Sequence, residues 1–92
     1  MIYATKIRMK TGCGNSWQLT EIDSVYLDGQ NISGFYKKEA VHELLQIYPG
    51  SIKVKLSPYP DLIPAKSVRG ERYVKSVPNE FGDDNLLCLR RV

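Results

Sequence analysis

The stretch KKEAVHELLQIYPG, residues 37–50, decides the fold class of this chain. Its apolar side chains recur at the three- and four-residue spacing of one helix face, at Val41, Leu44, Leu45 and Tyr48. The charged and polar side chains fall off this stripe, and the Pro-Gly pair at the end stops a helix. The sequence therefore predicts one amphipathic helix over residues 37–47.

On both sides of this helix the apolar pattern changes to the two-residue period of β-strands. Residues 52–56 alternate cleanly, with Ile52, Val54 and Leu56 expected to point inward. Residues 2–10 also alternate, and the side chains expected on the buried face are Tyr3, Thr5, Ile7 and Met9. The side chains expected on the wet face are Ala4, Lys6, Arg8 and Lys10. Residues 17–27 are rich in strand formers, but their alternation slips, which predicts one strand with a bulge or two short strands.

A hairpin is predicted in the second half of the chain, where Gly70-Glu71 is a two-residue turn signal between residues 65–69 and 72–77. This register places Arg69 opposite Arg72 and Lys66 opposite Lys75, and like charges directly opposite each other are unfavourable. Three explanations stay open: the register differs, the side chains splay into solvent, or an anion lies among them. The preceding residues 57–64 hold three prolines and are expected to form an exposed loop.

Residues 78–92 form the last predicted segment, which opens with a polar turn and continues with the apolar run Leu86-Leu87-Cys88-Leu89. Four consecutive residues of this kind are poorly placed in water. The segment is therefore expected to fold back and latch onto the core. Asp84 or Asn85 can form a side-chain-to-backbone turn just before the leucines.

Together these patterns predict a single α+β domain over residues 1–92. It contains a mainly antiparallel, strongly twisted sheet of four to five strands with one helix packed on one face, in the order β-β-α-β-β-β. A chain of 92 residues can build one modest core, and that leaves little room for a deep, enclosed catalytic cavity.

The composition is that of an ordinary globular domain, with 42% hydrophobic residues, 25% charged residues and a net charge of +3. Cys13 and Cys88 have no second cysteine or histidine at metal-ligand spacing, so neither a metal nor a cofactor is predicted. A 13–88 disulfide is the alternative, but nothing else in the sequence indicates export. No apolar run approaches the roughly 20 residues of a membrane span, so no membrane association is predicted and a cytoplasmic location is expected.

Catalysis by side chains requires converging groups, and few are available here. His42 is the only histidine and lies beside the apolar stripe, which is typical of a helix-surface residue that packs or caps locally. Cys13 lies between two glycines in a polar loop, yet a catalytic cysteine also needs a nearby base. We expect no enzymatic activity, with Cys13 chemistry as the remaining enzymatic alternative.

Basic residues alternate with apolar neighbours on several predicted strands. If these strands share one sheet, the basic side chains cover its open face, with the candidate residues Lys6, Arg8, Lys10, Lys53, Lys55, Lys75 and Tyr73. A basic sheet face with aromatic residues is one way in which proteins hold single-stranded nucleic acid. Lysines on the wet side of a sheet also serve ordinary solvation and edge protection, and an adjacent acidic turn favours that interpretation, with Glu80, Asp83 and Asp84.

The segment YVKSVPN (residues 73–79), with DNLL (84–87) and Leu89 after it, carries the most specific family signal. With ATKIR (residues 4–8) and YKKEAV (residues 36–41), it resembles a small, mainly bacterial family catalogued as domain of unknown function 3892. Arg90 stands where that family usually has a proline, and the loop at residues 57–64 is longer than usual. The resemblance implies a stand-alone α+β domain and supplies no activity, cofactor or catalytic residue.

The tail that resembles this family also has a sufficient structural explanation, and its members are expected to stabilise the fold: Asp84, Asn85, Leu86, Leu87 and Leu89. The sequence thus favours a non-enzymatic binding or accessory module whose partner and oligomeric state it does not define. The partner of such a module can be a protein. The alternative function is a domain that binds nucleic acid or another polyanion through the basic sheet face.

Overall fold

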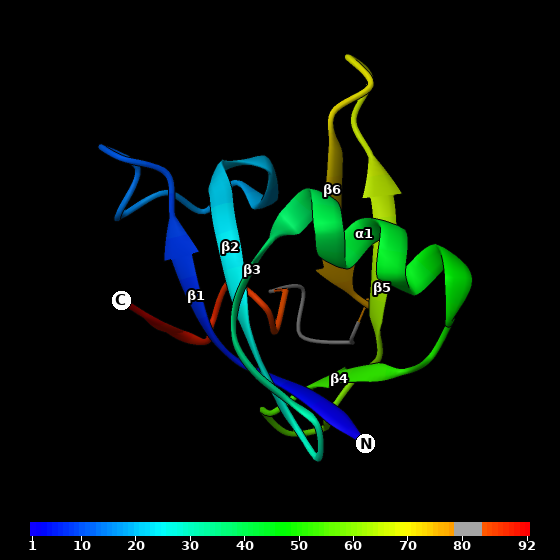
Figure 1. Ribbon diagram of the computed structural model, residues 1–92. Coiled ribbons are helices and arrows are strands. Elements are labelled where there is room, and N and C mark those ends of the chain that lie inside the picture. The colour runs from blue at the N-terminus through cyan, green and yellow to red at the C-terminus, as the bar shows by residue number, and fades with distance from the viewer. Residues whose placement is uncertain (79–83) are drawn as a thin grey trace.

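The computed structural model describes residues 1–78 and 84–92, and they form the predicted α+β arrangement (Figure 1). The strands are β1 (Ile2–Met9), β2 (Ile22–Gly29), β3 (Ile32–Lys37), β4 (Ile52–Val54), β5 (Leu62–Lys66), β6 (Arg72–Ser76) and β7 (Arg90–Arg91). A short 3-10 helix, η1 (Leu19–Glu21), precedes β2, and the helix α1 (Lys38–Ile47) follows β3. The structure adds β3 and β7 to the predicted order β-β-α-β-β-β.

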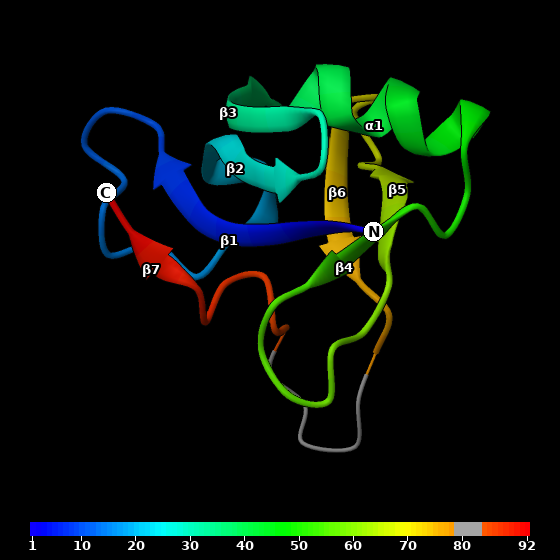
Figure 2. The same cartoon turned by 60° about the horizontal axis from the view of Figure 1, so that its bottom comes forward.

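Strand β1 is the centre of the main sheet, whose order is β3-β2-β1-β4. β2 pairs antiparallel with one side of β1. On the other side, β4 pairs in parallel with the first half of β1 and β7 pairs in parallel with the second half (Figure 2). One strand therefore holds together the N-terminal hairpin, the segment that follows the helix and the C-terminal tail.

The predicted alternation of β1 is wrong in its first half. Ala4 is fully buried, whereas Tyr3 and Thr5 are only partly buried. The register between β1 and β2 shifts between Ala4 and Lys6, which makes Thr5 the extra residue of a β-bulge. Because of this extra residue, Ala4 before the bulge and Ile7 after it both face the core.

Strand β3 is absent from the prediction, which assigns no secondary structure to residues 32–36. It pairs antiparallel with β2 across a two-residue turn, from Gly29 opposite Ile32 to Ser24 opposite Lys37. Its chain then enters α1 directly at Lys38. β3 therefore forms one margin of the main sheet and positions the start of the helix.

Helix α1 packs its predicted apolar stripe against the sheet and against the β5–β6 hairpin. Val41 and Leu45 are each only 1% exposed and belong to one continuous core cluster with residues of β1, β2, β4 and the tail. Leu44 and Tyr48, at the edges of the stripe, are less covered. Within residues 1–78 and 84–92, no helix combines the length and apolar character that crossing a bilayer demands.

Strands β5 and β6 form a separate two-stranded sheet whose register corrects the predicted one. Lys66 pairs with Arg72, and Ile63 pairs with Lys75. Arg69 lies in the turn and not opposite Arg72. The remaining pair of like charges is relieved because the Arg72 guanidinium forms an ion pair with Glu43 of α1.

The loop formed by the proline-rich segment, predicted over residues 57–64, is shorter than predicted. β5 begins at Leu62 and includes Pro64, which is compatible with a strand because a two-stranded sheet leaves each strand one side without ladder bonds. An isolated antiparallel bridge between Lys53 and Asp61 connects the main sheet to this hairpin. The β4 strand ends at Val54, two residues before the predicted end.

The described part of the tail, residues 84–92, packs onto the core. Its buried leucines are Leu86 (fully buried), Leu87 (6% exposed) and Leu89 (7% exposed). Glu80 and Asp83 of the predicted acidic turn lie outside the described residues. The leucines close the end of the core that β1 and the hairpin leave open.

Asp84 and Asn85 attach this tail to two other segments through polar contacts. The Asp84 carboxylate accepts a hydrogen bond from the Ser76 hydroxyl at 2.7 Å and another from the Leu86 amide at 2.9 Å. The Asn85 side-chain amide donates to the Leu56 carbonyl at 3.1 Å. Asp84 therefore initiates the turn that directs the leucines inward.

Replacing Leu86 with alanine should lower the free energy of unfolding by about 2–5 kcal/mol, because the truncation leaves a cavity in a fully buried site. Urea denaturation at equilibrium measures this change. The matched control is Leu56→Ala, at a residue 38% exposed, which should cost less than about 1 kcal/mol. Equal losses at the two positions would contradict the role of the tail in the core.

Candidate functional site

The face of the main sheet that points away from the core gathers basic and aromatic side chains. Lys6 and Arg8 of β1 alternate with the buried residues of that strand and point outward. Tyr26 of β2 pairs with Lys6, and Phe35 of β3 pairs with Tyr26, so all four side chains lie on one side of the sheet. We call this surface the outer face and define it by Tyr3, Lys6, Arg8, Tyr26, Phe35, Lys55 and Arg90.

On the outer face, cations lie directly over aromatic rings. Lys6 Nζ is 4.8 Å from the centroid of the Tyr26 ring, and Arg8 Cζ is 4.1 Å from the centroid of the Phe35 ring. The two rings meet edge to face, with centroids 5.1 Å apart and an interplanar angle of 86°. These are cation–π geometries, and they hold two positive charges at defined positions on a solvent-facing sheet.

Two further basic residues extend the outer face. Lys55 Nζ lies 5.7 Å from the centroid of the Tyr3 ring. Arg90 of β7 pairs in register with Lys6, which places the two side chains on the same side of neighbouring strands. The positive surface therefore continues across β1 in both directions.

The sequence missed the aromatic partners and Arg90 for identifiable reasons. Tyr26 and Phe35 become neighbours of Lys6 and Arg8 only through strand pairing, and β3 had not been predicted. Arg90 was assigned to the tail alone. One signal in the sequence could have identified Arg90. Two arginines directly follow an apolar leucine run, and this pattern is compatible with a short strand in which one arginine is exposed.

Lys75 and Tyr73, two members of the predicted basic face, do not lie on the outer face. Both belong to β6, in the separate two-stranded sheet. The prediction that all the basic strands share one sheet is therefore wrong for the hairpin. Its residues instead flank α1, and the Tyr73 carbonyl accepts a hydrogen bond from the helix.

Acidic partners neutralise the two ends of the predicted face. Lys10 Nζ lies 3.3 Å from a Glu71 oxygen, and Lys53 Nζ lies 2.7 Å from an Asp61 oxygen. Asp28 is exposed and pairs in register with Tyr3 at the margin of the sheet. The positive charge is consequently concentrated in the middle of β1 and on β7.

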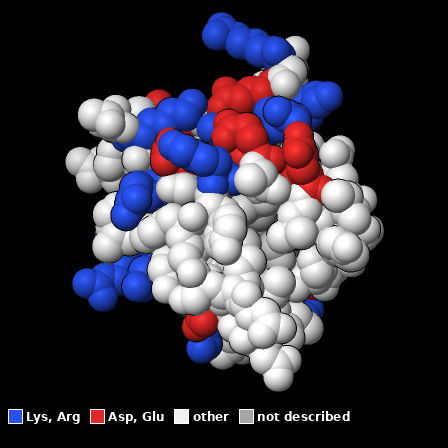
Figure 3. All heavy atoms as spheres, in the orientation of Figure 1, with Lys and Arg blue, Asp and Glu red and all other residues white. Residues whose placement is uncertain are grey.

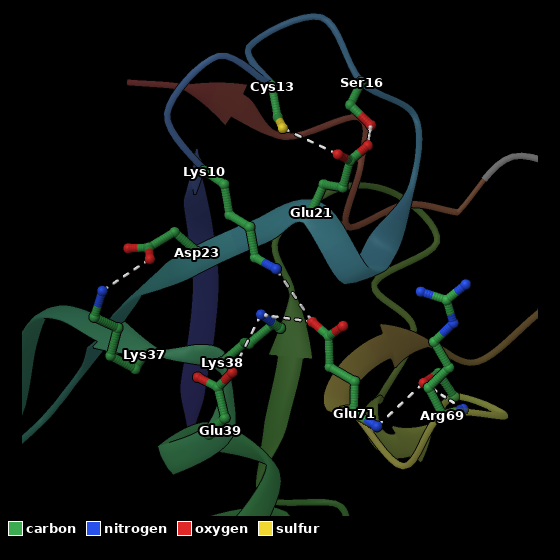
Figure 4. A network of polar contacts seen from close by, with 11 residues as sticks. Lys10, Cys13, Ser16, Glu21, Asp23, Lys37, Lys38, Glu39, Arg69 and Glu71 are labelled. Carbon is green, nitrogen blue, oxygen red and sulfur yellow. Dashed lines mark hydrogen bonds and ion pairs between the residues drawn. The ribbon is translucent and has the colours of Figure 1, made fainter.

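A second polar cluster lies where α1 begins (Figure 4). Lys38 is buried, at 2% exposed, and its Nζ lies 3.1 Å from Glu71 and 3.2 Å from Glu39. Lys10 reaches the same Glu71 oxygen from the end of β1. The cluster joins β1, the helix start and the β5–β6 turn, and no sequence pattern indicated that Lys38 would be buried.

The charges in this cluster set the pKa values of its members. Burial opposes the charged form of Lys38, but hydrogen bonds to Glu71 and Glu39 outweigh burial and raise its pKa. The hydrogen bond from Lys38 lowers the pKa of Glu71. Lys38 is thus protonated at neutral pH and acts as an anchor, because a nucleophilic lysine requires the opposite shift.

Cys13 is hydrogen bonded in a way that lowers its reactivity. Its thiol donates to the Glu21 carboxylate at 3.0 Å, and this bond raises the pKa of Cys13 and lowers that of Glu21. The Ser16 hydroxyl donates to the other Glu21 oxygen. A raised pKa reduces the thiolate fraction, which is the reverse of what activates a nucleophilic cysteine.

His42 is buried, at 3% exposed, and not on the helix surface. Its Nδ1–H donates to the Tyr73 carbonyl at 2.9 Å, which ties α1 to β6. Among the residues that the structure describes, no three His, Cys, Asp or Glu side chains converge on a common metal position.

The two ends of the molecule differ in their surface charge (Figure 3). Charged side chains of both signs gather in the upper part of this view, around the hairpin turn, and basic side chains continue down its left side. The middle and the lower right of the same view are almost free of charged side chains. This face of the molecule therefore has a charged region and a separate uncharged one.

Comparison with known proteins gave no match: no family model fits the chain, and neither the curated proteins nor the solved structures contain a similar one.

Replacing Glu71 with glutamine should destabilise the protein by about 1–2 kcal/mol at pH 7, because buried Lys38 loses one of its two carboxylate partners. Since the folded-state pKa of Glu71 lies below its ordinary value of 4.5, this contribution is present above pH 4.5 and disappears as the pH falls through the folded-state pKa. Urea denaturation of both proteins across this range measures the difference.

The matched control is Glu43→Gln, which removes an ion pair between exposed side chains and should change stability by less than about 1 kcal/mol. A Glu71→Gln effect that persists undiminished in acid would contradict the assigned charge pairing.

Proposed function

We propose that the protein is a non-enzymatic binding module that holds single-stranded nucleic acid on the outer face. The observation that carries the proposal is the row formed by Lys6, Tyr26, Phe35 and Arg8, in which two cations are fixed over two touching rings. Surfaces that combine a positive groove or face with aromatic rings bind single strands by pairing phosphates and stacking bases.

The two kinds of side chain have separate roles in this proposal. Lys6 and Arg90 lie side by side on neighbouring strands and offer ammonium and guanidinium groups to consecutive phosphates. The Arg8 guanidinium carbon lies 4.1 Å from the centroid of the Phe35 ring. In this proposal a base stacks on the side of the guanidinium that faces away from the ring. Tyr26 contributes a further ring beside it.

A single strand fits this surface better than a duplex does. Stacking on a side chain requires an unpaired base whose flat side is accessible, and a duplex hides those sides in its own stack. The acidic residues Asp28 and Asp61 lie at the margins, so the positive region is narrow. A narrow positive strip suits one phosphate backbone.

We also propose a bacterial origin, which follows the sequence resemblance, and a cytoplasmic location. Cys13 and Cys88 are both free thiols, which is compatible with a reducing compartment. The raised pKa of the Cys13 thiol supports a binding role over cysteine catalysis.

Titration of a labelled single-stranded oligonucleotide of about ten nucleotides, followed by fluorescence anisotropy, tests the proposal. Binding should be micromolar in about 50 mM salt and weaken steeply by about 200 mM, because counterions are released from the phosphates. Lys6→Ala with Arg8→Ala should weaken binding about tenfold or more and lower the salt slope by about one per lost phosphate contact.

The control is Lys66→Ala with Arg69→Ala, which removes the same charge from the separate hairpin and should leave the affinity within about twofold. The absence of binding in low salt, or an equal loss in both double variants, would overturn the proposal. A duplex of the same sequence should bind more weakly.

A further inference from the structure

Strand β3 forms a free margin of the main sheet. In both ribbon views no described segment lies beside it on the side opposite β2 (Figures 1 and 2). The β2–β3 turn has two residues, so Gly29 and Ile32 form the closing hydrogen-bonded pair, and every second residue of β3 then directs its N–H and C=O away from β2. In β3 these outward residues are Ser33, Phe35 and Lys37.

This margin lacks the usual protection against pairing. Natural sheets cover their edges or interrupt them with proline, bulges and charged side chains. β3 contains no proline, and its one charged side chain, Lys37, is already held by Asp23 at 2.8 Å. Its backbone departs from ordinary strand geometry only at Gly34, at a φ of +149°. The backbone of β3 is therefore a ready template for another strand.

An apolar groove of about 230 Å³ runs along the core side of this margin, between β3 and α1. It is lined by Leu27, Ile32, Tyr36, Ala40, Val41 and Leu44. Gly34 lies between Ile32 and Tyr36 on the same side of the strand, and a Cβ added at Gly34 would meet no atom within 4 Å. The space beside Gly34 is therefore open on the side of the strand that Ile32 and Tyr36 share.

We propose that a second copy of this chain occupies the margin, with the two β3 strands paired antiparallel about a two-fold axis at Phe35. In this register Phe35 pairs with the partner's Phe35, and Ser33 pairs with the partner's Lys37. The outward backbone groups of the two strands then meet each other. The proposed pairing uses the edge and the core side of β3 and shares only Phe35 with the outer face. It does not depend on the nucleic-acid proposal.

The same register fills the groove. Tyr36 stands opposite the partner's Gly34, so each Tyr36 ring enters the open position above a glycine, an arrangement that stabilises glycine in strands. Tyr36 is 37% exposed in the single chain and becomes covered in the pair. Ala40 and Leu44 of α1 then flank the inserted ring.

Charge and aromatic pairing favour this occupant over an unrelated extended peptide. No like charges stand opposite each other, because each Lys37 faces a serine. On the outer side, the Tyr26–Phe35 edge-to-face contact continues across the axis into the partner's Phe35 and Tyr26. A second copy supplies aromatic residues at both required positions, opposite Phe35 and opposite Gly34. An unrelated peptide would do so only if its sequence happened to match.

Sedimentation equilibrium over a concentration series tests the pairing. The wild-type mass should approach twice the 10.5 kDa of the chain, and Tyr36→Glu should weaken the association about tenfold or more because a charge enters an apolar groove. Tyr59→Glu makes the same change at a residue 51% exposed in the loop after β4 and should leave the mass unchanged. Circular dichroism melts report whether each variant is folded.

A disulfide-crosslinking experiment tests the proposed register directly. It does not require that the Tyr36→Glu variant folds. In a Cys13→Ser, Cys88→Ser background, Phe35→Cys places two thiols on the axis, at the roughly 5.5 Å Cα spacing that a disulfide spans. Mild oxidation should give a covalent dimer. Ser33→Cys in the same background lies too far from its own copy and should stay monomeric under oxidation.

A wild-type chain that stays monomeric throughout the concentration series would overturn the proposal. Equal crosslinking of the two cysteine variants would also overturn it, because it would show contact without this register. A monomer that binds an added apolar strand-forming peptide, with loss on Tyr36→Glu, would assign the groove to a peptide partner in place of a second copy.

Discussion

The register shift at Thr5 is the constraint on which the rest of the structure depends. With strict two-residue alternation, Ala4 and Ile7 could not both face the core, since a slip of one residue moves a side chain to the other side of a sheet. β1 also pairs with β2, β4 and β7, so its register fixes the position of all three. The same shift places Tyr3, which precedes the bulge, on the same side of the sheet as Lys6 and Arg8, which follow it.

The parts of the fold that periodicity could predict are those with uninterrupted patterns. The helix stripe from Val41 to Leu45 and the alternation of residues 52–54 both match the structure. β3 was missed because Gly34 has no side chain and leaves a gap in the apolar side of its pattern. The bulge at Thr5 and the hairpin register depend on the partner strands, which a single strand's sequence does not encode.

The candidate site also contains residues that periodicity could predict and residues that depend on strand pairing. Lys6, Arg8 and Lys55 could be predicted, because exposed positions on an amphipathic strand follow directly from alternation. Their aromatic partners could not, because the ring of Phe35 reaches Arg8 only after β3 has paired with β2. The burial of Lys38 could not be predicted either, because its carboxylate partner Glu71 lies in a turn that is distant in the sequence.

We propose that the cation–π row on the outer face is a binding surface and not merely a solvated side of the sheet. A nitrogen-15 chemical-shift titration with a single-stranded oligonucleotide tests this, because it reports every backbone amide at once. We expect the largest shifts at residues 6–8, Tyr26, Phe35 and Arg90, with little change in β5 and β6. Shifts concentrated on the β5–β6 hairpin, or no shifts in low salt, would contradict it.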